Sequence, residues 1–343
     1  MKKHRIILAG CGAMANIWLD YVATRKDAEI VALVDIHKQN AISMAENRNL
    51  NAAIFTDLSA ALEQVEADIV FDVTPPSSHK QVVITSLRAG CHVFGEKPMA
   101  ESLRDAQEIL AVVQETGKQY AVMQNRRFIK PIRSLQHFLA ADHIGKIGSI
   151  HANFFLGPHF GGFRDEMDHP LILDMAIHTF DQARFMIQAE PVSVYCHEYN
   201  PPGSWYQGNA SAVCIFEMSN GTVFTYNGSW CAEGLQTSWE SSWRITGSKG
   251  SVTWNGFDDL SCEVVDESKP TEFFNSYKQV AIPNVWEGQE GHFGCLDEMF
   301  ASIAEDRRAE TDCRDNIYSM AMVFAAIESA KTGQKVIIES LFS

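Results

Sequence analysis

The chain has 343 residues and a formal net charge of −15, and 46% of its residues are hydrophobic and 21% charged. Because this length exceeds that of one hydrophobic core, we expect two domains. No lysine- or arginine-rich run is present. Nucleic acids and anionic membranes are bound through such basic residues, so neither is an expected partner.

The N-terminus resembles an export signal only superficially. Leu8-Ala9-Gly10-Cys11 is similar to a lipoprotein cleavage box and follows several basic residues. A signal peptide needs about 7–15 consecutive apolar residues, and here glycines interrupt the run that starts at Ile6. No apolar stretch approaches the ~18 residues of a membrane span. The eight cysteines form no CxxC pair, so we expect reduced thiols and a cytoplasmic protein.

The first third of the chain alternates short apolar runs with helical stretches. We predict strands at residues 5–9, 29–34, 68–73, 91–94 and 119–123. We predict helices at about 13–24, 38–48, 79–89 and 102–116. Strands that alternate with helices through short connections form a parallel sheet covered on both faces, so the fold class of this part is α/β.

The pattern changes after residue 123. We predict helices at about 131–140, 170–187, 291–305 and 315–331, a strand at 147–155 and several β segments over 191–255. This pattern indicates an α+β domain with a large, mostly antiparallel, open-faced sheet. The predicted domains are therefore residues 1–123, for dinucleotide binding, and residues 124–343, for substrate binding and oligomerisation.

A glycine-rich motif lies between the first strand and the first helix. Gly10-Cys11-Gly12-Ala13-Met14-Ala15 reads GxGxxA. The first glycine permits a tight turn, the second lets the backbone approach a pyrophosphate, and the helix N-terminus faces the phosphates. Such turns also occur without ligands, so the surrounding strand–helix pattern is what indicates a Rossmann domain.

An acidic residue follows the second predicted strand. Asp35 lies 20 residues beyond Ala15, where a carboxylate bonds the ribose 2′-hydroxyl. The same charge would repel a 2′-phosphate, so NAD is favoured over NADP, although Lys38 is close in sequence. The alternative for Asp35 is a helix N-cap.

Three further segments carry polar side chains suited to chemistry. Glu96-Lys97-Pro98 falls at a strand end where ligands of α/β sheets bind, and we predict a cis bond at Lys97-Pro98; the alternative is a solvated lysine before a turn. Gln124-Asn125-Arg126-Arg127-Phe128 offers amides and guanidinium groups for a nicotinamide or substrate pocket, or alternatively for bonds between the domains.

The third segment is the helix at 170–187. Asp174, His178 and Asp181 have the spacing i, i+4, i+7 and are expected on one face of an otherwise apolar helix. Buried ionisable groups are costly unless they are paired or functional. The alternatives are a satisfied Asp–His pair in the core and a metal site with His169; we expect no metal, because the spacing matches no common zinc signature.

Together these segments resemble the glucose–fructose oxidoreductase, inositol dehydrogenase and rhizopine-catabolism family, Gfo/Idh/MocA. The resemblance covers nearly the whole chain, through GCGAMA at 10–15, TPPSSH at 74–79, EKP at 96–98, NRRF at 125–128, LDMAIHTFD at 173–181 and the closing helix near Glu328. The family usually carries a glycine-rich run before its DxxxH helix, where this chain has Glu166-Met167-Asp168-His169-Pro170.

The resemblance implies that Lys97, Asp174 and His178 are catalytic. The predicted cofactor-binding residues are Gly10, Gly12, Ala13, Met14, Asp35, Thr74, Pro75, His79, Glu96, Lys97 and Asn125. The predicted substrate-binding residues are Lys97, Arg126, His159, Arg164, Asp174 and His178. His178 would act as general base, Lys97 would stabilise the developing alkoxide, and Asp174 would support both.

The expected function is therefore NAD(P)-dependent hydride transfer to or from a secondary hydroxyl of a sugar, inositol or related polyol. Two alternatives remain open: a glycosidase or anhydrosugar-opening enzyme with internal redox and no net NADH, and a nonenzymatic NAD-binding regulatory protein. The family also implies a homodimer or homotetramer assembled through the C-terminal sheet.

Overall fold

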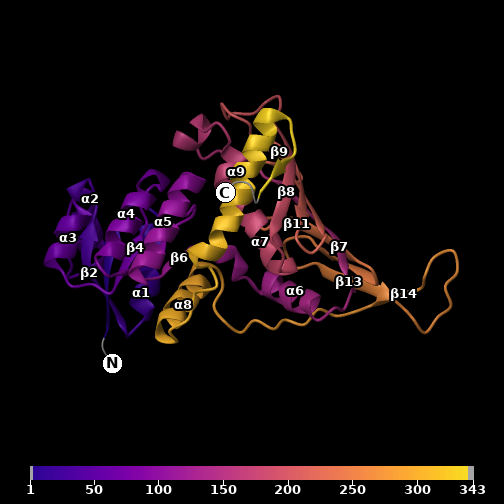
Figure 1. The fold of residues 1–343 in the computed structure, drawn as a ribbon, viewed down its shortest axis with the longest axis horizontal. Coiled ribbons are helices and arrows are strands. Elements are labelled where there is room, and N and C mark those ends of the chain that lie inside the picture. The colour runs from indigo at the N-terminus through magenta and orange to yellow at the C-terminus, as the bar shows by residue number, and fades with distance from the viewer. Residues whose placement is uncertain (1–2, 339–343) are drawn as a thin grey trace. The chain divides into compact units, whose positions relative to one another are not determined.

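The computed structural model describes residues 3–338, which fall into two compact units (Figure 1). The first unit contains the chain up to Asn125 together with Gln289–Ile317. The second contains Arg126–Gly288 and the chain from Tyr318 onward. Residues 289–317, which the sequence analysis assigned to the second domain, thus belong by their contacts to the first unit. Within residues 3–338, no helix is long and apolar enough to cross a membrane.

The first unit is built on a six-stranded parallel sheet. Its strands are β1 (His4–Ala9), β2 (Ala28–Val34), β3 (Ala53–Phe55), β4 (Ile69–Asp72), β5 (His92–Gly95) and β6 (Tyr120–Val122). Its helices are α1 (Ala15–Thr24), α2 (Lys38–Arg48), α3 (Leu58–Gln64), α4 (Pro76–Arg88), α5 (Leu103–Thr116) and α8 (Gly291–Ala304). The strand order β3-β2-β1-β4-β5-β6 is that of the Rossmann fold, which confirms the predicted fold class.

Helix α8 completes the core of this unit although it is distant in sequence. The ring of Phe300 lies 6.3 Å from that of Phe71 and 5.3 Å from that of Phe94, measured between centroids. One turn earlier in the helix, Asp297 accepts from the Tyr21 hydroxyl of α1 at 2.7 Å. The hydrophobic faces of β4 and β5 are therefore buried by a segment that returns from the C-terminal part of the chain.

Two elements of the first unit were not predicted. β3 has three residues, none of them buried, and α3 has seven with one buried residue, so neither shows a clear hydrophobic period. The signal that was available is Asp57, whose side chain accepts from the backbone N–H of Ala60 at 2.8 Å and caps α3.

The second unit is built on a nine-stranded sheet in the order β14-β13-β12-β11-β7-β10-β9-β8-β15. Its strands are β7 (Ile147–Phe155), β8 (Pro191–Tyr199), β9 (Ser211–Met218), β10 (Val223–Ser229), β11 (Ser242–Gly247), β12 (Gly250–Trp254), β13 (Leu260–Val265), β14 (Tyr277–Gln279) and β15 (Val336–Ile337). Among the pairings of this nine-stranded sheet within residues 3–338, only that of β7 with β10 is parallel.

One face of this sheet is covered by helices and the other is open. The helical elements are α6 (Lys130–Ala140), the π-helical turn η3 (Leu171–Ala176), α7 (Ile177–Ile187) and α9 (Cys313–Thr332), and the short 3-10 turns are η1 (Asn125–Arg127) and η2 (Gly162–Glu166). Along β9 every second residue is buried: Cys214 and Phe216 are inaccessible, whereas Ile215 is 46% exposed. Helices α6 and α7 lie on the covered side (Figure 1), so the predicted open-faced, mostly antiparallel sheet is confirmed.

Candidate active site

The glycine-rich turn joins β1 to α1 and has the backbone that a pyrophosphate requires. Gly10 has φ = 91°, and a Cβ there would lie 2.5 Å from the carbonyl oxygen of Val73. At Gly12, apart from the glycine and its two chain neighbours, no heavy atom among residues 3–338 lies within 4 Å of a built Cβ, so this part of the turn is open. The N–H groups at the start of α1 are therefore reachable by phosphate oxygens. The turn therefore fits a dinucleotide. Ala13 and Met14, the other residues of the turn that were predicted to bind the cofactor, lie in the same segment.

Asp35 directly follows β2 and links the glycine-rich turn to α2. Its Oδ2 accepts from the backbone N–H of Cys11 at 2.9 Å, and its Oδ1 accepts from the N–H of His37 at 2.8 Å and from Nδ2 of Asn40 at 3.2 Å. Burial, reinforced by the Asp35 charge, raises the pKa of the Cys11 thiol to about 12. The alternative of a helix N-cap for Asp35 is wrong, because the N-cap of α2 is His37; the ribose contact of Asp35 stays a prediction.

His79, predicted to contact the cofactor, is completely buried between two backbone carbonyl groups. Its Nδ1 lies 2.7 Å from the oxygen of Pro98 and its Nε2 lies 2.8 Å from the oxygen of Thr74. Asp72, at the end of β4, accepts from the N–H and the hydroxyl of Thr74 at 3.1 and 2.5 Å. Burial raises the pKa of the Asp72 carboxyl, and the nearby charge of His79 opposes that effect. Pro75 precedes the first turn of α4.

The Glu96-Lys97-Pro98 segment follows β5, at the carboxyl edge of the parallel sheet. The Lys97-Pro98 bond is cis, as predicted. The carboxylate of Glu96 accepts from the indole N–H of Trp18 at 2.9 Å, and its backbone N–H donates to the oxygen of Asp72 at 2.9 Å. The sequence analysis did not single out Trp18. A tryptophan on the buried face of α1 could have indicated this contact, because a buried indole N–H needs a hydrogen-bond acceptor.

Asn125, a predicted cofactor-binding residue, lies next to a histidine that the sequence analysis did not single out. Asn125 lies in the 3-10 turn after β6, and its Nδ2 is 3.3 Å from Nδ1 of His292 at the start of α8. Because α8 joins this unit from far along the chain, no local pattern could have indicated this pair. The amide of Asn125 is thereby oriented by an imidazole.

In the second unit, Asp174 lies in the π-helical turn and pairs with Arg164. Nε of Arg164 donates to Oδ2 of Asp174 at 2.6 Å. The guanidinium also lies over the rings of Phe160 and Phe163, 5.0 and 4.7 Å from their centroids. Two predicted substrate-binding residues are therefore in direct contact with each other.

His178 lies in the first turn of α7 and is 6% exposed. The helix predicted over 170–187 is α-helical only from Ile177, because the preceding turn closes its hydrogen bonds five residues apart instead of four. The expected single α-helical face shared by Asp174, His178 and Asp181 is therefore wrong in its first turn.

Asp181 has a different partner from Asp174. Its two carboxylate oxygens accept from Nε and Nη2 of Arg127 at 2.6 and 2.7 Å, and Ser319 donates to it at 2.7 Å. Both charged side chains are at most 4% exposed. This is a buried ion pair inside the second unit.

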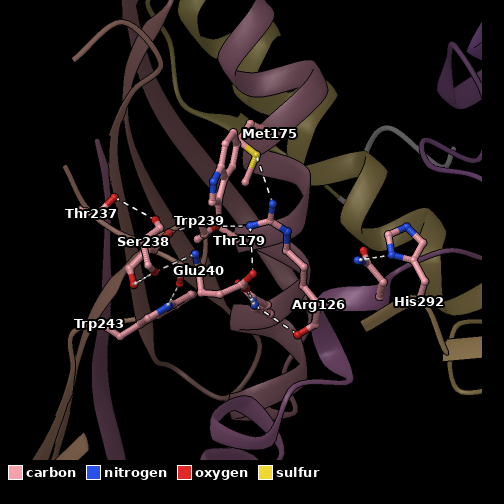
Figure 2. A network of polar contacts seen from close by, with 12 residues as sticks. Arg126, Met175, Thr179, Thr237, Ser238, Trp239, Glu240, Trp243 and His292 are labelled. Carbon is pink, nitrogen blue, oxygen red and sulfur yellow. Dashed lines mark hydrogen bonds and ion pairs between the residues drawn. The ribbon is translucent and has the colours of Figure 1, made fainter. Parts of the chain in front are cut away.

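Arg126 is held by groups of its own unit (Figure 2). Its Nη1 donates to the carbonyl oxygen of Trp239 and lies 3.5 Å from the carboxylate of Glu240. Its Nη2 lies 3.7 Å from the sulfur of Met175, which adjoins Asp174. Burial lowers the pKa of Arg126 and the Glu240 charge opposes this. Arg126 thus fixes the loop that carries Trp239, and its predicted substrate contact stays a prediction.

Aromatic side chains gather around the loop that contains Arg164. The imidazole of His159 stacks on Trp205 with centroids 3.7 Å apart, and its Nε2 lies 3.0 Å from Glu233. The ring of Phe160 lies 6.2 Å from Trp239, which is 43% exposed. By contrast, three other tryptophans are at most 3% exposed and belong to the packing of the sheet: Trp230, Trp243 and Trp254.

Within residues 3–338, no group of three or more His, Cys, Asp or Glu side chains is arranged to hold a metal ion. The first unit carries the glycine-rich turn that fits a dinucleotide. The second unit carries Asp174, His178 and a group of aromatic rings. A Rossmann unit of this kind joined to an open-faced α+β unit defines a class of dinucleotide-dependent oxidoreductases.

Comparison with known families identifies the class more closely. Residues 4–124 match the model of the Gfo/Idh/MocA oxidoreductase family with an NAD-binding Rossmann fold, and residues 132–253 match the Gfo/Idh/MocA C-terminal domain. The chain therefore belongs to the Gfo/Idh/MocA family and is an NAD(P)-dependent oxidoreductase, as the sequence motifs implied.

Relatives with names support the same assignment. The chain is 30% identical over 238 residues to D-glucoside 3-dehydrogenase of Escherichia coli, covering 65% of this chain and 67% of the relative. It is 24% identical over 365 residues to inositol 2-dehydrogenase of Rhizobium meliloti, covering 97% and 99%. A crystal structure of an oxidoreductase from Agrobacterium radiobacter, in complex with NAD+, L-tartaric acid and magnesium, has the same fold, with a TM-score of 0.86 and 20% identity over 99% and 100% of the two chains.

Proposed function

We propose that the protein transfers a hydride between NAD and a secondary hydroxyl or ketone of a sugar, inositol or related polyol. The observation that carries the proposal is that one chain retains the lysine of the EKP segment together with the aspartate and histidine of the DxxxH helix. Relatives named glucoside and inositol dehydrogenases act on polyhydroxylated rings, which supports this class of substrate.

In the proposed reaction, His178 removes the proton of the substrate hydroxyl, since histidine titrates nearest neutral pH. Lys97 donates to the same oxygen and stabilises the negative charge that develops on it. Asp174 supports His178 and Lys97 electrostatically. NAD, when bound, would supply the acceptor for the hydride that leaves the hydroxyl-bearing carbon. In the reverse direction His178 returns the proton to the ketone oxygen.

We assign the cofactor to the first unit. The N–H groups of the Gly10–Met14 turn would bind the pyrophosphate, and Asp35 the adenine-side ribose. The loop at Thr74 and Pro75, together with Glu96 and Asn125, would contact the nicotinamide half. The fixed negative charge of Asp35 opposes a 2′-phosphate, which favours NAD over NADP; Lys38 is exposed and could bind such a phosphate only if that charge were absent.

The second unit has groups suited to a ring with several hydroxyls. Arg164 and His159 offer donors, and the exposed face of Trp239 offers a surface on which a sugar ring can stack. Arg126 keeps the Trp239 loop in place. These contacts would orient the substrate rather than take part in proton transfer.

We further propose that the protein is a cytoplasmic homodimer or homotetramer whose subunits meet through the open face of the C-terminal sheet. That face exposes apolar side chains at 36–46% of their surface, namely Tyr195, Tyr199, Val213, Ile215 and Val223. An apolar patch of this kind is typical of a protein interface. All eight cysteines are free, as expected in a reducing compartment.

The test is absorbance-monitored NADH formation across sugars, inositols and sugar acids. Turnover should be lost in Lys97→Ala and His178→Ala, while NAD binding, followed by quenching of tryptophan fluorescence, is retained. Undiminished turnover in both variants would refute the catalytic assignment. No turnover on the whole panel, with intact NAD binding, would refute net dehydrogenation and support internal redox or a regulatory role.

A further inference from the structure

The chain neighbours of Lys97 are held by buried side chains from separate elements. On one side, the indole N–H of Trp18 on α1 donates to the carboxylate of Glu96 at 2.9 Å. On the other side, the hydroxyl of Tyr120 on β6 donates to the carbonyl oxygen of Met99 at 3.2 Å. Trp18 and Tyr120 are both 0% exposed, so water does not compete for these bonds.

His79 on α4 bonds the residue directly after Lys97. Its Nδ1 lies 2.7 Å from the oxygen of Pro98, and its Nε2 lies 2.8 Å from the oxygen of Thr74. Carbonyl oxygens only accept, and an imidazole nitrogen donates only when it carries a proton. Both contacts are hydrogen bonds when both ring nitrogens carry a proton.

His79 thus joins two loops at the carboxyl edge of the sheet. One loop follows β4 and contains Thr74, and the other follows β5 and contains Lys97. Because the ring is inaccessible to solvent, its atoms serve these loops and not a ligand. A buried carbonyl left without a donor is costly, so each loop is held firmly in the position that the ring dictates.

We propose that His79 is a positioning residue for Lys97, acting through the carbonyl of Pro98 and assisted by Trp18 and Tyr120. The inference rests on the proposed function, in which Lys97 contacts the reacting oxygen. A misplacement of about 1 Å can reduce the rate of an enzymatic step about 10²-fold. Loss of this support should therefore lower kcat much more than it weakens cofactor binding.

The experiment uses the full chain with saturating NAD and the panel polyol that gives the fastest turnover. His79→Gln should lower kcat about 10²-fold, and Tyr120→Phe, which removes one hydroxyl, about three- to tenfold. The dissociation constant of NAD should change by less than about threefold in Tyr120→Phe. In His79→Gln it should change by a smaller factor than kcat does, because His79 also holds the Thr74 loop that is assigned to the cofactor. The matched control is Tyr21→Phe, which removes one buried tyrosine hydroxyl elsewhere in the same unit; that hydroxyl donates to Asp297 and accepts from Arg25. This control should keep the kcat of the unchanged protein.

A spectroscopic measurement tests the same inference without turnover. In ¹⁵N-histidine-labelled protein, the ring of His79 should show a proton on both nitrogens, each protected from exchange with solvent. A ring nitrogen without a proton would show that His79 does not donate hydrogen bonds to both Pro98 and Thr74, and this result would overturn the inference. This measurement, together with Tyr120→Phe, decides the matter even if His79→Gln does not fold.

The outcomes separate the inference from the proposed function. If Lys97→Ala is inactive while His79→Gln and Tyr120→Phe keep full kcat, the positioning role is refuted and the proposed function stands. If Lys97→Ala keeps its turnover, the proposed function fails whatever the other variants do. If Tyr120→Phe and the Tyr21→Phe control lose kcat equally, the effect is general destabilisation, which also refutes the positioning role.

Discussion

Arg164 and Asp174 form an ion pair, with Nε of the arginine 2.6 Å from Oδ2 of the aspartate. The pair joins a glycine-containing loop to the π-helical turn that precedes His178. Arg164 remains 32% exposed at its side chain, whereas Asp174 is 16% exposed. The arginine therefore reaches the aspartate from the solvent side and fixes the direction of its carboxylate.

Removing this arginine should weaken substrate binding and also slow the reaction. We expect Arg164→Ala to raise KM about tenfold, because a hydrogen bond to a charged group contributes about 1.5–3 kcal/mol. Steady-state kinetics with varied polyol measures the change. The control is Arg104→Ala, which removes an exposed arginine that pairs with Glu108 in the first unit. Equal kinetics for Arg164→Ala and the unchanged protein would contradict the predicted role.

The preference for NAD over NADP should depend on the charge of Asp35. Asp35→Asn keeps an oxygen that accepts from the N–H of Cys11 but removes the negative charge. We expect the ratio of NADP to NAD affinity to rise about tenfold, as repulsion of a 2′-phosphate is lost. Fluorescence titration with each cofactor gives the ratio. Adding Lys38→Ala should reverse part of the gain, and an unchanged ratio in Asp35→Asn would show that the charge does not select the cofactor.

The buried pair of Arg127 and Asp181 should be required for stability and not for chemistry. Asp181→Ala leaves the arginine buried without its carboxylate. We expect this to lower the free energy of unfolding by about 3–5 kcal/mol. Urea denaturation measures the loss. The double variant Arg127→Met/Asp181→Leu should recover much of it, because apolar side chains replace both charges of the pair. A double variant as unstable as the single one would contradict this account.

His92 should make stability fall as the solution is acidified. Its Nδ1 accepts from the backbone N–H of Gln119 at 3.2 Å, and burial, with smaller effects from Lys118 and His4, lowers its pKa to about 4. The unfolded chain therefore binds the proton first. The contribution is complete above about pH 6.5 and is lost as the pH falls toward 4.

Denaturation midpoints between pH 7 and pH 4 measure this loss, which we expect to be on the order of 2 kcal/mol after allowance for solvent screening. His92→Asn is the matched control, because its side-chain oxygen can accept from Gln119 but does not titrate. The slope of stability against pH should be shallower in His92→Asn. Parallel curves for the two proteins would assign the acid sensitivity to other groups.

Much of the first unit was predictable because its information is local. Alternating apolar runs and helices indicate a parallel sheet, and the glycine-rich turn and Asp35 fall at strand ends that their neighbours define. The π-helical turn that holds Asp174 was not predictable, since an apolar run fits either hydrogen-bonding pattern. Nor was the Arg127–Asp181 pair, because its partners are 54 residues apart. Tertiary packing alone makes them neighbours.

The return of residues 289–317 to the first unit has a consequence for any attempt to exchange parts between relatives. The chain passes from one unit to the other at residues 125/126, 288/289 and 317/318. A fragment that stops at residue 125 lacks Phe300 and leaves the apolar faces of Phe71 and Phe94 without their cover. A functional graft of the nucleotide-binding half must therefore carry two separate stretches of gene, and recombination at a single crossover would yield a protein with an incomplete core.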